Sequence, residues 1–229
     1  MFQKMTKQII GHFEKTWKEY DGWYETHPAL YQSELTALRQ IIPSGAGLEI
    51  GVGTGRFAVP LGVRFGLDPA IHMLQLAKRR RILVVQGLGE SLPFRDESFD
   101  FVQIVFVLEF IDQPNFFLKE AARSLGRGGS LILGFIDRET RWGQYYVQDP
   151  SHRHHFHPPS PKEILTIFDD IGLEFQAAFQ TLFQPPPDIT QKENPRRGFG
   201  EGGFVVMKAT KNNAEFPSSR KNSGGIPQR

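Results

Sequence analysis

The fold of this chain is decided by the stretch Gly47-Leu48-Glu49-Ile50-Gly51-Val52-Gly53-Thr54-Gly55-Arg56-Phe57. Its apolar residues, bounded by glycine, predict a short, buried parallel strand. The alternating glycines that follow predict a turn in which no Cβ keeps a ligand away from the main chain. A helix is predicted to begin at Thr54, and its free N–H groups would face the same ligand. Strand, turn and helix together indicate a site for a nucleotide-like cofactor.

The spacing of the glycines separates the candidate cofactors. A nicotinamide or flavin fingerprint needs its third glycine at the sixth position and an acid about 20 residues further on. Here the sixth position is Arg56, and the acid that closes the next apolar run, Asp68, arrives only 13 residues after Gly55. This spacing disfavours a nicotinamide-dependent oxidoreductase, which we keep as an alternative.

The glycine pattern preceded by Glu49 and followed by Asp68 resembles the first motif of the class I, Rossmann-like S-adenosylmethionine-dependent methyltransferases. The small-molecule enzymes of the ubiquinone and menaquinone biosynthesis type are the most similar group. The resemblance implies S-adenosylmethionine as the cofactor. It places the glycine turn against the methionine and ribose of the cofactor, and Asp68 against both ribose hydroxyls.

A second match lies in residues 87–94, Gly-Leu-Gly-Glu-Ser-Leu-Pro-Phe, which resemble the third motif of this family. The family's usual acid, which accepts a hydrogen bond from the adenine amino group, is Leu88 here. Leu88 and Leu92 are therefore expected to sandwich the adenine ring. The resemblance implies these cofactor-binding residues: Glu49, Gly51, Gly53, Gly55, Asp68, Pro69, Leu88, Gly89 and Glu90.

The match extends from residue 47 to residue 136 and implies the fold class. Phe99-Asp100 precedes a run that is apolar on both faces, as in the centre of a parallel sheet. A helix, a Gly-Gly stop and another apolar strand follow, in the order typical of these enzymes. We expect a three-layer α/β sandwich with a seven-stranded, mainly parallel sheet that ends in an antiparallel hairpin.

Residues 1–210 are expected to form a single methyltransferase domain, followed by a disordered tail at 211–229. Residues 1–43 would form a helical cap over the cofactor cleft, with a first amphipathic helix interrupted at residues 21–24 and a second helix from Pro28. Some rings among Tyr20, Trp23, Tyr24 and Tyr31 are expected to line the substrate pocket; packing between the two helices is the alternative.

The segment 137–159 is the predicted substrate lid, because a long irregular loop inside a compact domain is usually functional or disordered. Four of the seven histidines of the chain fall within residues 152–157. A metal site there is the minority interpretation, since the chain has no cysteine and no helical histidine pair. The candidates for substrate orientation or proton removal, and hence the predicted catalytic residues, are Glu109, Tyr145, His154 and His157.

Composition sets the outer limits. The chain has 229 residues, of which 39% are hydrophobic and 23% are charged, a balance that suits one globular α/β domain. The formal net charge of +2 gives no electrostatic case for nucleic acid as the main partner. No window reaches the ~18 apolar residues of a membrane span, so a cytoplasmic location is expected.

The function that the sequence predicts is S-adenosylmethionine-dependent methyl transfer to a small-molecule acceptor. Besides the oxidoreductase, the alternative is a non-catalytic member of the same fold that binds the cofactor or a partner without transfer.

Overall fold

Strand β1 (Gly47–Ile50) is the middle one of the five parallel strands of the sheet, and its residues are all buried. It pairs in parallel with β2 (Phe65–Asp68) on one side and with β4 (Phe99–Val105) on the other. A strand covered on both faces needs apolar side chains in both directions, and Leu48 and Ile50 supply them. This computed structural model describes residues 2–149, 156–187 and 189–212.

The sheet has the strand order β3-β2-β1-β4-β5-β8-β6-β7. Strands β3 (Leu83–Gln86), β2, β1, β4 and β5 (Leu125–Ile136) run in parallel, and β8 (Phe204–Lys211) then pairs antiparallel with β5. The mainly parallel sheet with an antiparallel end is confirmed. It has eight strands rather than seven, because residues 196–197 form β7 (Arg196–Arg197) beside β6 (Leu173–Thr181). Strand β5 also begins before the Gly-Gly stop, at Leu125.

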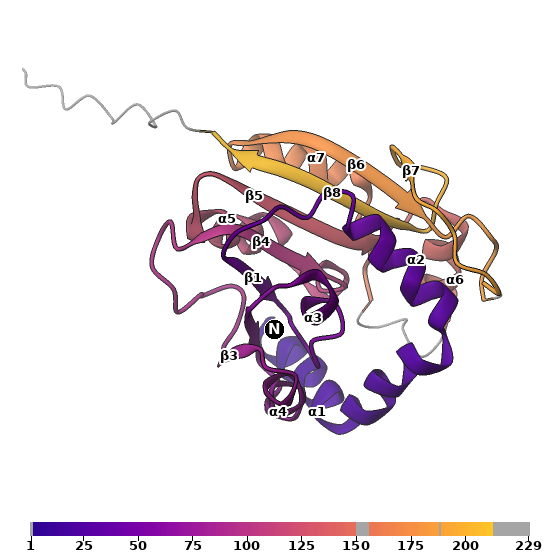
Figure 1. The fold of residues 1–229 in the computed structure, drawn as a ribbon, viewed down its shortest axis with the longest axis horizontal. Coiled ribbons are helices and arrows are strands. Elements are labelled where there is room, and N and C mark those ends of the chain that lie inside the picture. The colour runs from indigo at the N-terminus through magenta and orange to yellow at the C-terminus, as the bar shows by residue number, and fades with distance from the viewer. Residues whose placement is uncertain (1, 150–155, 188, 213–229) are drawn as a thin grey trace, which may run out of the picture.

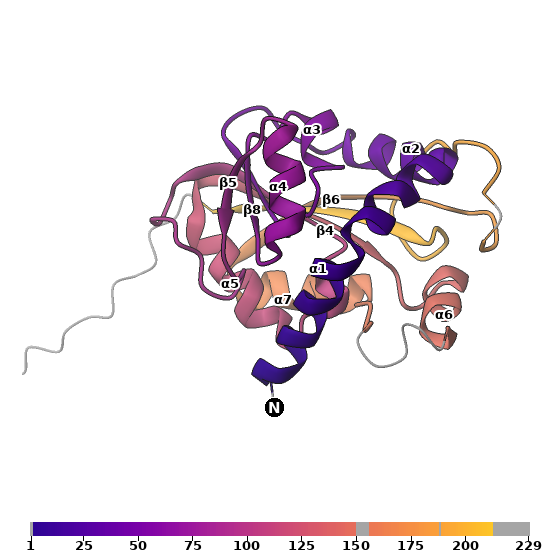
Figure 2. The same ribbon diagram turned by 90° about the horizontal axis from the view of Figure 1, so that it is seen from below.

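Helices cover both faces of this sheet (Figure 1). Figure 2 shows α3 and α4 on one face and α5 and α7 on the other, while α1 crosses between the two layers. The bounds are α3 (Ala58–Leu61), α4 (Ile71–Arg79), α5 (Pro114–Ser124) and α7 (Pro161–Asp170). Helix α3 begins four residues later than the predicted start at Thr54, so the glycine turn is longer than expected.

The N-terminal helices differ from the prediction in where the first one is interrupted. Helix α1 (Phe2–Thr26) continues through residues 21–24, and its backbone leaves helical geometry at Thr16 instead. The Thr16 hydroxyl donates to the carbonyl oxygen of His12 at 3.0 Å, an i−4 bond of the kind that bends helices. Helix α2 (Pro28–Leu38) begins with proline in its first turn, as expected.

The predicted lid segment is more regular than expected. It contains helix α6 (Arg141–Gln148), which is capped by Thr140, whose hydroxyl accepts from the Gly143 N–H. Residues 150–155 and most of the predicted tail, 213–229, lie outside the described residues. The capping box at the start of α7 is confirmed, since Ser160 and Glu163 exchange hydrogen bonds. No helix in the described ranges has the length and apolarity needed to cross a membrane.

Candidate functional site

A cavity of about 990 Å³ lies between helix α1 and the carboxyl ends of β1, β2 and β4. Ligands of open α/β sheets gather at these strand ends. Sites for small molecules typically measure roughly 300–1,000 Å³, so this one is large enough for two ligands in contact. We call its two parts the glycine side, formed by Gly51, Gly53, Asp68, Leu88 and Gly89, and the aromatic side, formed by Tyr20, Tyr24, Glu34, Tyr146 and Phe156.

Bare main chain forms the floor of the glycine side. Gly51 and Gly53 both have positive φ, +74° and +52°, which residues with a Cβ rarely adopt. A Cβ on Gly51 would lie 2.2 Å from a methyl carbon of Val107, so the fold itself requires glycine there. A Cβ on Gly53 would meet only the Tyr20 ring, at 3.6 Å, and would otherwise extend into the cavity. Gly53 therefore leaves a place where a ligand can approach the backbone.

Asp68 stands at the end of β2, beside this turn. Its Oδ2 accepts from the Gly53 N–H at 2.9 Å and its Oδ1 accepts from the Ala70 N–H at 2.8 Å. These bonds fix the carboxylate while each oxygen keeps a further lone pair for a ligand. Burial raises the pKa of Asp68 to about 6, against the lowering effect of the two backbone bonds. The carboxylate is therefore aimed into the cavity and is ionised at neutral pH.

The other predicted cofactor residues divide between the cavity and the core. Pro69, Leu88, Gly89 and Glu90 line the cavity. Leu88 is 42% exposed and so presents an apolar surface to whatever occupies the cavity. A Cβ on Gly89 would lie 2.2 Å from the Phe117 ring, which explains glycine at the second position after Gly87.

Glu49 and Gly55 do not line the cavity. A Cβ on Gly55 would lie 2.5 Å from the Ile82 side chain, so this glycine lets the turn pack against the residues after α4. Glu49 is buried in β1, and burial raises the pKa of its carboxyl to about 8. Both positions support the turn from behind.

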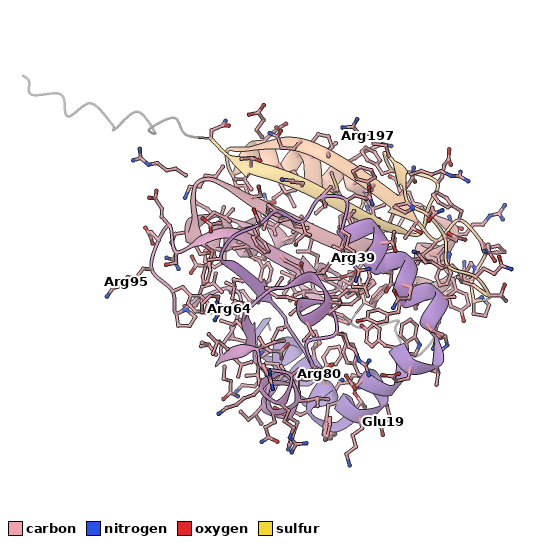
Figure 3. The ribbon with its side chains drawn as sticks, viewed as in Figure 1. Glu19, Arg39, Arg64, Arg80, Arg95 and Arg197 are labelled. Atoms are coloured by element: carbon pink, nitrogen blue, oxygen red, sulfur yellow. The ribbon has the colours of Figure 1, made fainter. Side chains whose placement is uncertain are left out.

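Helix α1 is fastened over the cavity by charged contacts. Asp21 pairs with Arg56 of the glycine turn at 2.7 Å and with Arg80, which follows α4, at 2.6 Å. Figure 3 labels Arg80 where α4 meets α1. Although burial opposes ionisation, hydrogen bonds from both arginines hold the pKa of Asp21 well below its usual value. Nearer the N-terminus of α1, Glu14 accepts from the Ile71 N–H and pairs with His72.

The aromatic wall is a continuous series of rings in edge-to-face or tilted contact around the cavity. Its ring centroids are 5.3–5.8 Å apart, the separation that such pairs prefer. The series begins on α1, crosses the 3₁₀ helix η1 (Leu108–Phe110) and ends on α6 and the segment after it. Its members are Tyr24, Tyr20, Phe13, Phe110, Phe156 and Tyr146.

Sequence reasoning missed Glu34, which lines the cavity from α2 and is only 1% exposed. A signal for it exists in the sequence, because Glu34 is four residues after Leu30 and four before Leu38, on the apolar face of the helix. An acid on a buried helical face needs a reason. Tyr20, Trp23 and Tyr24 line the cavity as expected, whereas Tyr31 lies outside its lining and donates to the Arg56 carbonyl oxygen.

The three predicted catalytic residues that the structure describes, Glu109, Tyr145 and His157, lie outside the lining of the cavity. Glu109 is fully buried: its Oε1 accepts from the Ile136 N–H at 3.0 Å, and its carbonyl oxygen accepts from the His157 N–H at 2.6 Å. Burial raises the pKa of Glu109 to about 7. The Tyr145 side chain is 41% exposed, and its neighbour Tyr146 lines the cavity instead. His154 lies outside the described residues.

The residues present fit a nucleoside cofactor. Main chain at Gly53 leaves room for close approach, Asp68 offers acceptors for a pair of hydroxyls, and Leu88 offers an apolar face for a base. In the described ranges no group of three or more His, Cys, Asp or Glu side chains is arranged to hold a metal ion.

Comparisons with known proteins agree with this geometry. Residues 48–133 match the model of a methyltransferase domain. The crystal structure of a SAM-dependent methyltransferase from Thermotoga maritima, named as a possible histamine N-methyltransferase, is 41% identical and superposes with a TM-score of 0.83. The match covers 87% of this chain and 98% of that one.

Two sequence relatives extend the comparison. An uncharacterized protein of Methanocaldococcus jannaschii is 41% identical over 203 residues, which are 87% of this chain and 98% of that protein. A demethylmenaquinone methyltransferase of Staphylococcus aureus is 28% identical over 219 residues, 88% of this chain and 87% of that enzyme.

Proposed function

This chain belongs to the S-adenosylmethionine-dependent methyltransferases, and from that premise we propose that it methylates a small molecule bound on the aromatic side of the cavity, with the cofactor on the glycine side. The oxidoreductase and the non-catalytic alternatives are not favoured, because the matching domain model and the Thermotoga and Staphylococcus proteins are methyltransferases. A cytoplasmic location and the lack of a nucleic-acid partner stay predictions from the sequence.

The proposal is supported above all by one observation: a glycine turn with bare main chain and a carboxylate held by hydrogen bonds line the same cavity. Gly53 donates its N–H to Asp68, so the bare turn and the acceptor for the ribose hydroxyls form a single unit. This unit opens into the same cavity as the aromatic wall. Donor and acceptor molecules would therefore share one enclosed space, as in-line transfer requires.

The sulfonium of the bound cofactor supplies an activated methyl group, so the protein has to orient and enclose the reactants rather than activate them. Asp68 and Gly53 would hold the nucleoside. The aromatic wall would exclude water and position the acceptor against the methyl group. Glu109 is proposed as a positioning residue, because its side chain and main chain together hold Ile136, which lines the cavity, and His157.

Calorimetry with S-adenosylhomocysteine, the product form of the cofactor, tests the proposal on the wild type and on Asp68→Asn. We expect the variant to lose about 100-fold in affinity, since two charge-assisted hydrogen bonds are worth about 3 kcal/mol. Because burial raises the pKa of Asp68 to about 6, wild-type affinity should rise as the pH is raised through that value and then level off. The variant should show no such rise.

Equal affinity of the two proteins, or no binding of S-adenosylhomocysteine to the wild type, would contradict the proposed cofactor site. NAD serves as the negative control ligand, and release of S-adenosylhomocysteine in the presence of acceptors measures transfer itself.

A further inference from the structure

Glu34 has an unusual position for a carboxylate. It extends from α2 into the lining of the cavity and is 1% exposed. Its Oε2 has no hydrogen-bond partner among the described residues, and the Glu34 side chain forms no ion pair with any of them. Burial alone raises the pKa of Glu34 well above its ordinary value, so nothing described in the protein compensates for the loss of water.

A buried acid without a partner is costly to the fold. Leucine occupies the positions one helical turn before and after Glu34, and an apolar side chain at position 34 would remove the cost. The missing partner is therefore expected to come from the cavity, where Glu34 is directed. A ligand with a positive charge or a strong hydrogen-bond donor would supply the partner that this carboxylate lacks.

The surroundings of Glu34 favour a cation. The charge of Glu34 acts on Tyr20 and Tyr24 of α1 and on Tyr146 of α6, where it adds to the effect of burial in raising the pKa of each hydroxyl. These three tyrosines line the same cavity as the Glu34 carboxylate. Aromatic faces attract ammonium groups, and Tyr and Trp are the stronger ring types for this contact. Trp23 also lines the cavity.

The charges of the whole cavity lining point the same way. No lysine or arginine of the described residues lines the cavity, although the chain as a whole carries a net charge of +2. Asp68 and Glu90 belong to the predicted cofactor site, and of the other three acids Glu34 is buried whereas Glu19 and Asp112 are exposed. An anionic acceptor would be repelled by this lining. The acids of the lining are Glu19, Glu34, Asp68, Glu90 and Asp112.

We propose that the methyl acceptor is an organic amine, whose ammonium group binds between the carboxylate of Glu34 and the rings of Tyr20, Tyr24 and Tyr146. This inference rests on the proposed function and adds the chemical class of the acceptor. Glu34 is the residue that selects a cationic acceptor over a neutral one of the same shape.

Binding of matched probes tests the proposal. The probes are benzylamine, 2-phenylethylamine and 4-phenylbutylamine, each paired with the alcohol of the same length, titrated into the protein saturated with S-adenosylhomocysteine. We expect at least one amine to bind about 10-fold or more tightly than its alcohol. Glu34→Gln should abolish this preference while its affinity for S-adenosylhomocysteine stays within about twofold of the wild type.

Glu19→Gln is the matched control, because Glu19 is an exposed acid of the same cavity lining and should leave the preference for amines intact. No preference for any amine in the wild type, or a preference that survives Glu34→Gln, would overturn the proposal. If either result is obtained while S-adenosylhomocysteine binds normally, only the amine inference is refuted. Failure of that ligand to bind refutes the proposed function, and the inference with it.

A second measurement uses the wild type alone and so does not depend on folding of the variant. Because burial favours the neutral carboxyl of Glu34 and an ammonium group favours the charged one, amine binding measured from about pH 5 to about pH 8 should release a proton over part of that range, detected as a different apparent enthalpy in two buffers. The titratable groups that face Glu34 are Tyr20, Tyr24, Tyr31 and Tyr146, and burial raises the pKa of all four, so they stay neutral. Amine binding without proton release would contradict the assignment to Glu34.

Discussion

The glycine side of the cavity is formed by glycine main chain, Asp68 and Leu88 within residues 51–89, whereas the aromatic side is formed by side chains of α1, α2, α6 and the segment after α6. On the glycine side, neighbouring residues in the sequence bind one another, as Gly53 binds Asp68. On the aromatic side, Glu34 of α2 lines the cavity together with Tyr146 of α6, more than 100 residues later.

This difference corresponds to the two tasks of the site. A cofactor shared by a whole family can be bound by backbone, because backbone geometry depends little on the side chains around it. An acceptor has to be distinguished from other small molecules, and that requires side-chain charge and shape. Substitutions on the glycine side, on the aromatic side and in helix α1, which joins them, should therefore have separable effects on the binding of cofactor and acceptor.

The largest expected effect is on the glycine side. In Gly53→Ala the new methyl group would stand in the cavity where the cofactor approaches the main chain, and overpacking of this kind costs about 2 kcal/mol, or roughly 30-fold in affinity. Binding of S-adenosylhomocysteine, measured by calorimetry, should weaken by that factor.

Gly62→Ala is the matched control for Gly53→Ala. Gly62 has φ +75°, so alanine is strained there too, but no atom lies within 4 Å of the added Cβ and the residue does not line the cavity. Both variants should lose about 1 kcal/mol of unfolding free energy. Only Gly53→Ala should lose cofactor affinity. An equal loss of cofactor affinity in both variants would contradict a cofactor site formed by the main chain at Gly53.

The same contrast explains how much the sequence could predict. The glycine turn, Asp68 and the α7 capping box were predictable because each depends on residues close together in the chain. The site residues among them remain predictions until binding is measured. The position of the break in α1 was not predictable from hydrophobic periodicity, since a single hydroxyl bond at Thr16 accompanies it.

The aromatic side was less predictable because it depends on rotation of helices and on tertiary contacts. A choice between Tyr145 and Tyr146 requires the phase of α6, which the sequence pattern does not fix. Phe106 lines the cavity with φ +56°, a conformation that no local pattern suggests for phenylalanine. The signal at Glu34 was present in the sequence as an acid on an apolar helical face.

An intermediate effect is expected where α1 joins the two sides. In Asp21→Asn the contacts with Arg56 and Arg80 lose their charge pairing, and Asp21 is only 15% exposed, so water replaces them poorly. Helix α1 should therefore separate more often from the glycine turn and from the end of α4. We expect cofactor affinity and amine affinity to fall together by about 10-fold, or about 1.4 kcal/mol, with faster amide exchange in residues 7–26.

Glu25→Gln provides the comparison for Asp21→Asn. Glu25 also pairs with Arg56, at 2.6 Å, but its side chain is 69% exposed, and an exposed ion pair contributes little. Its substitution should leave both affinities within about twofold. If Asp21→Asn weakened amine binding and left cofactor binding unchanged, the prediction that α1 encloses both sides of the cavity would be wrong.

The smallest expected effect separates the neighbouring tyrosines of α6. Tyr146→Phe removes one hydroxyl from the aromatic side and keeps the ring, and a single hydroxyl interaction contributes about 1 kcal/mol, so the affinity for the acceptor amine should fall about fivefold. Tyr145→Phe removes the same atom from an exposed ring outside the cavity lining and should change affinity less than twofold. Neither substitution should alter binding of S-adenosylhomocysteine, because neither residue lies on the glycine side. A larger effect at Tyr145 than at Tyr146 would restore the residue that the sequence alone proposed, and would mean that α6 turns when an acceptor binds.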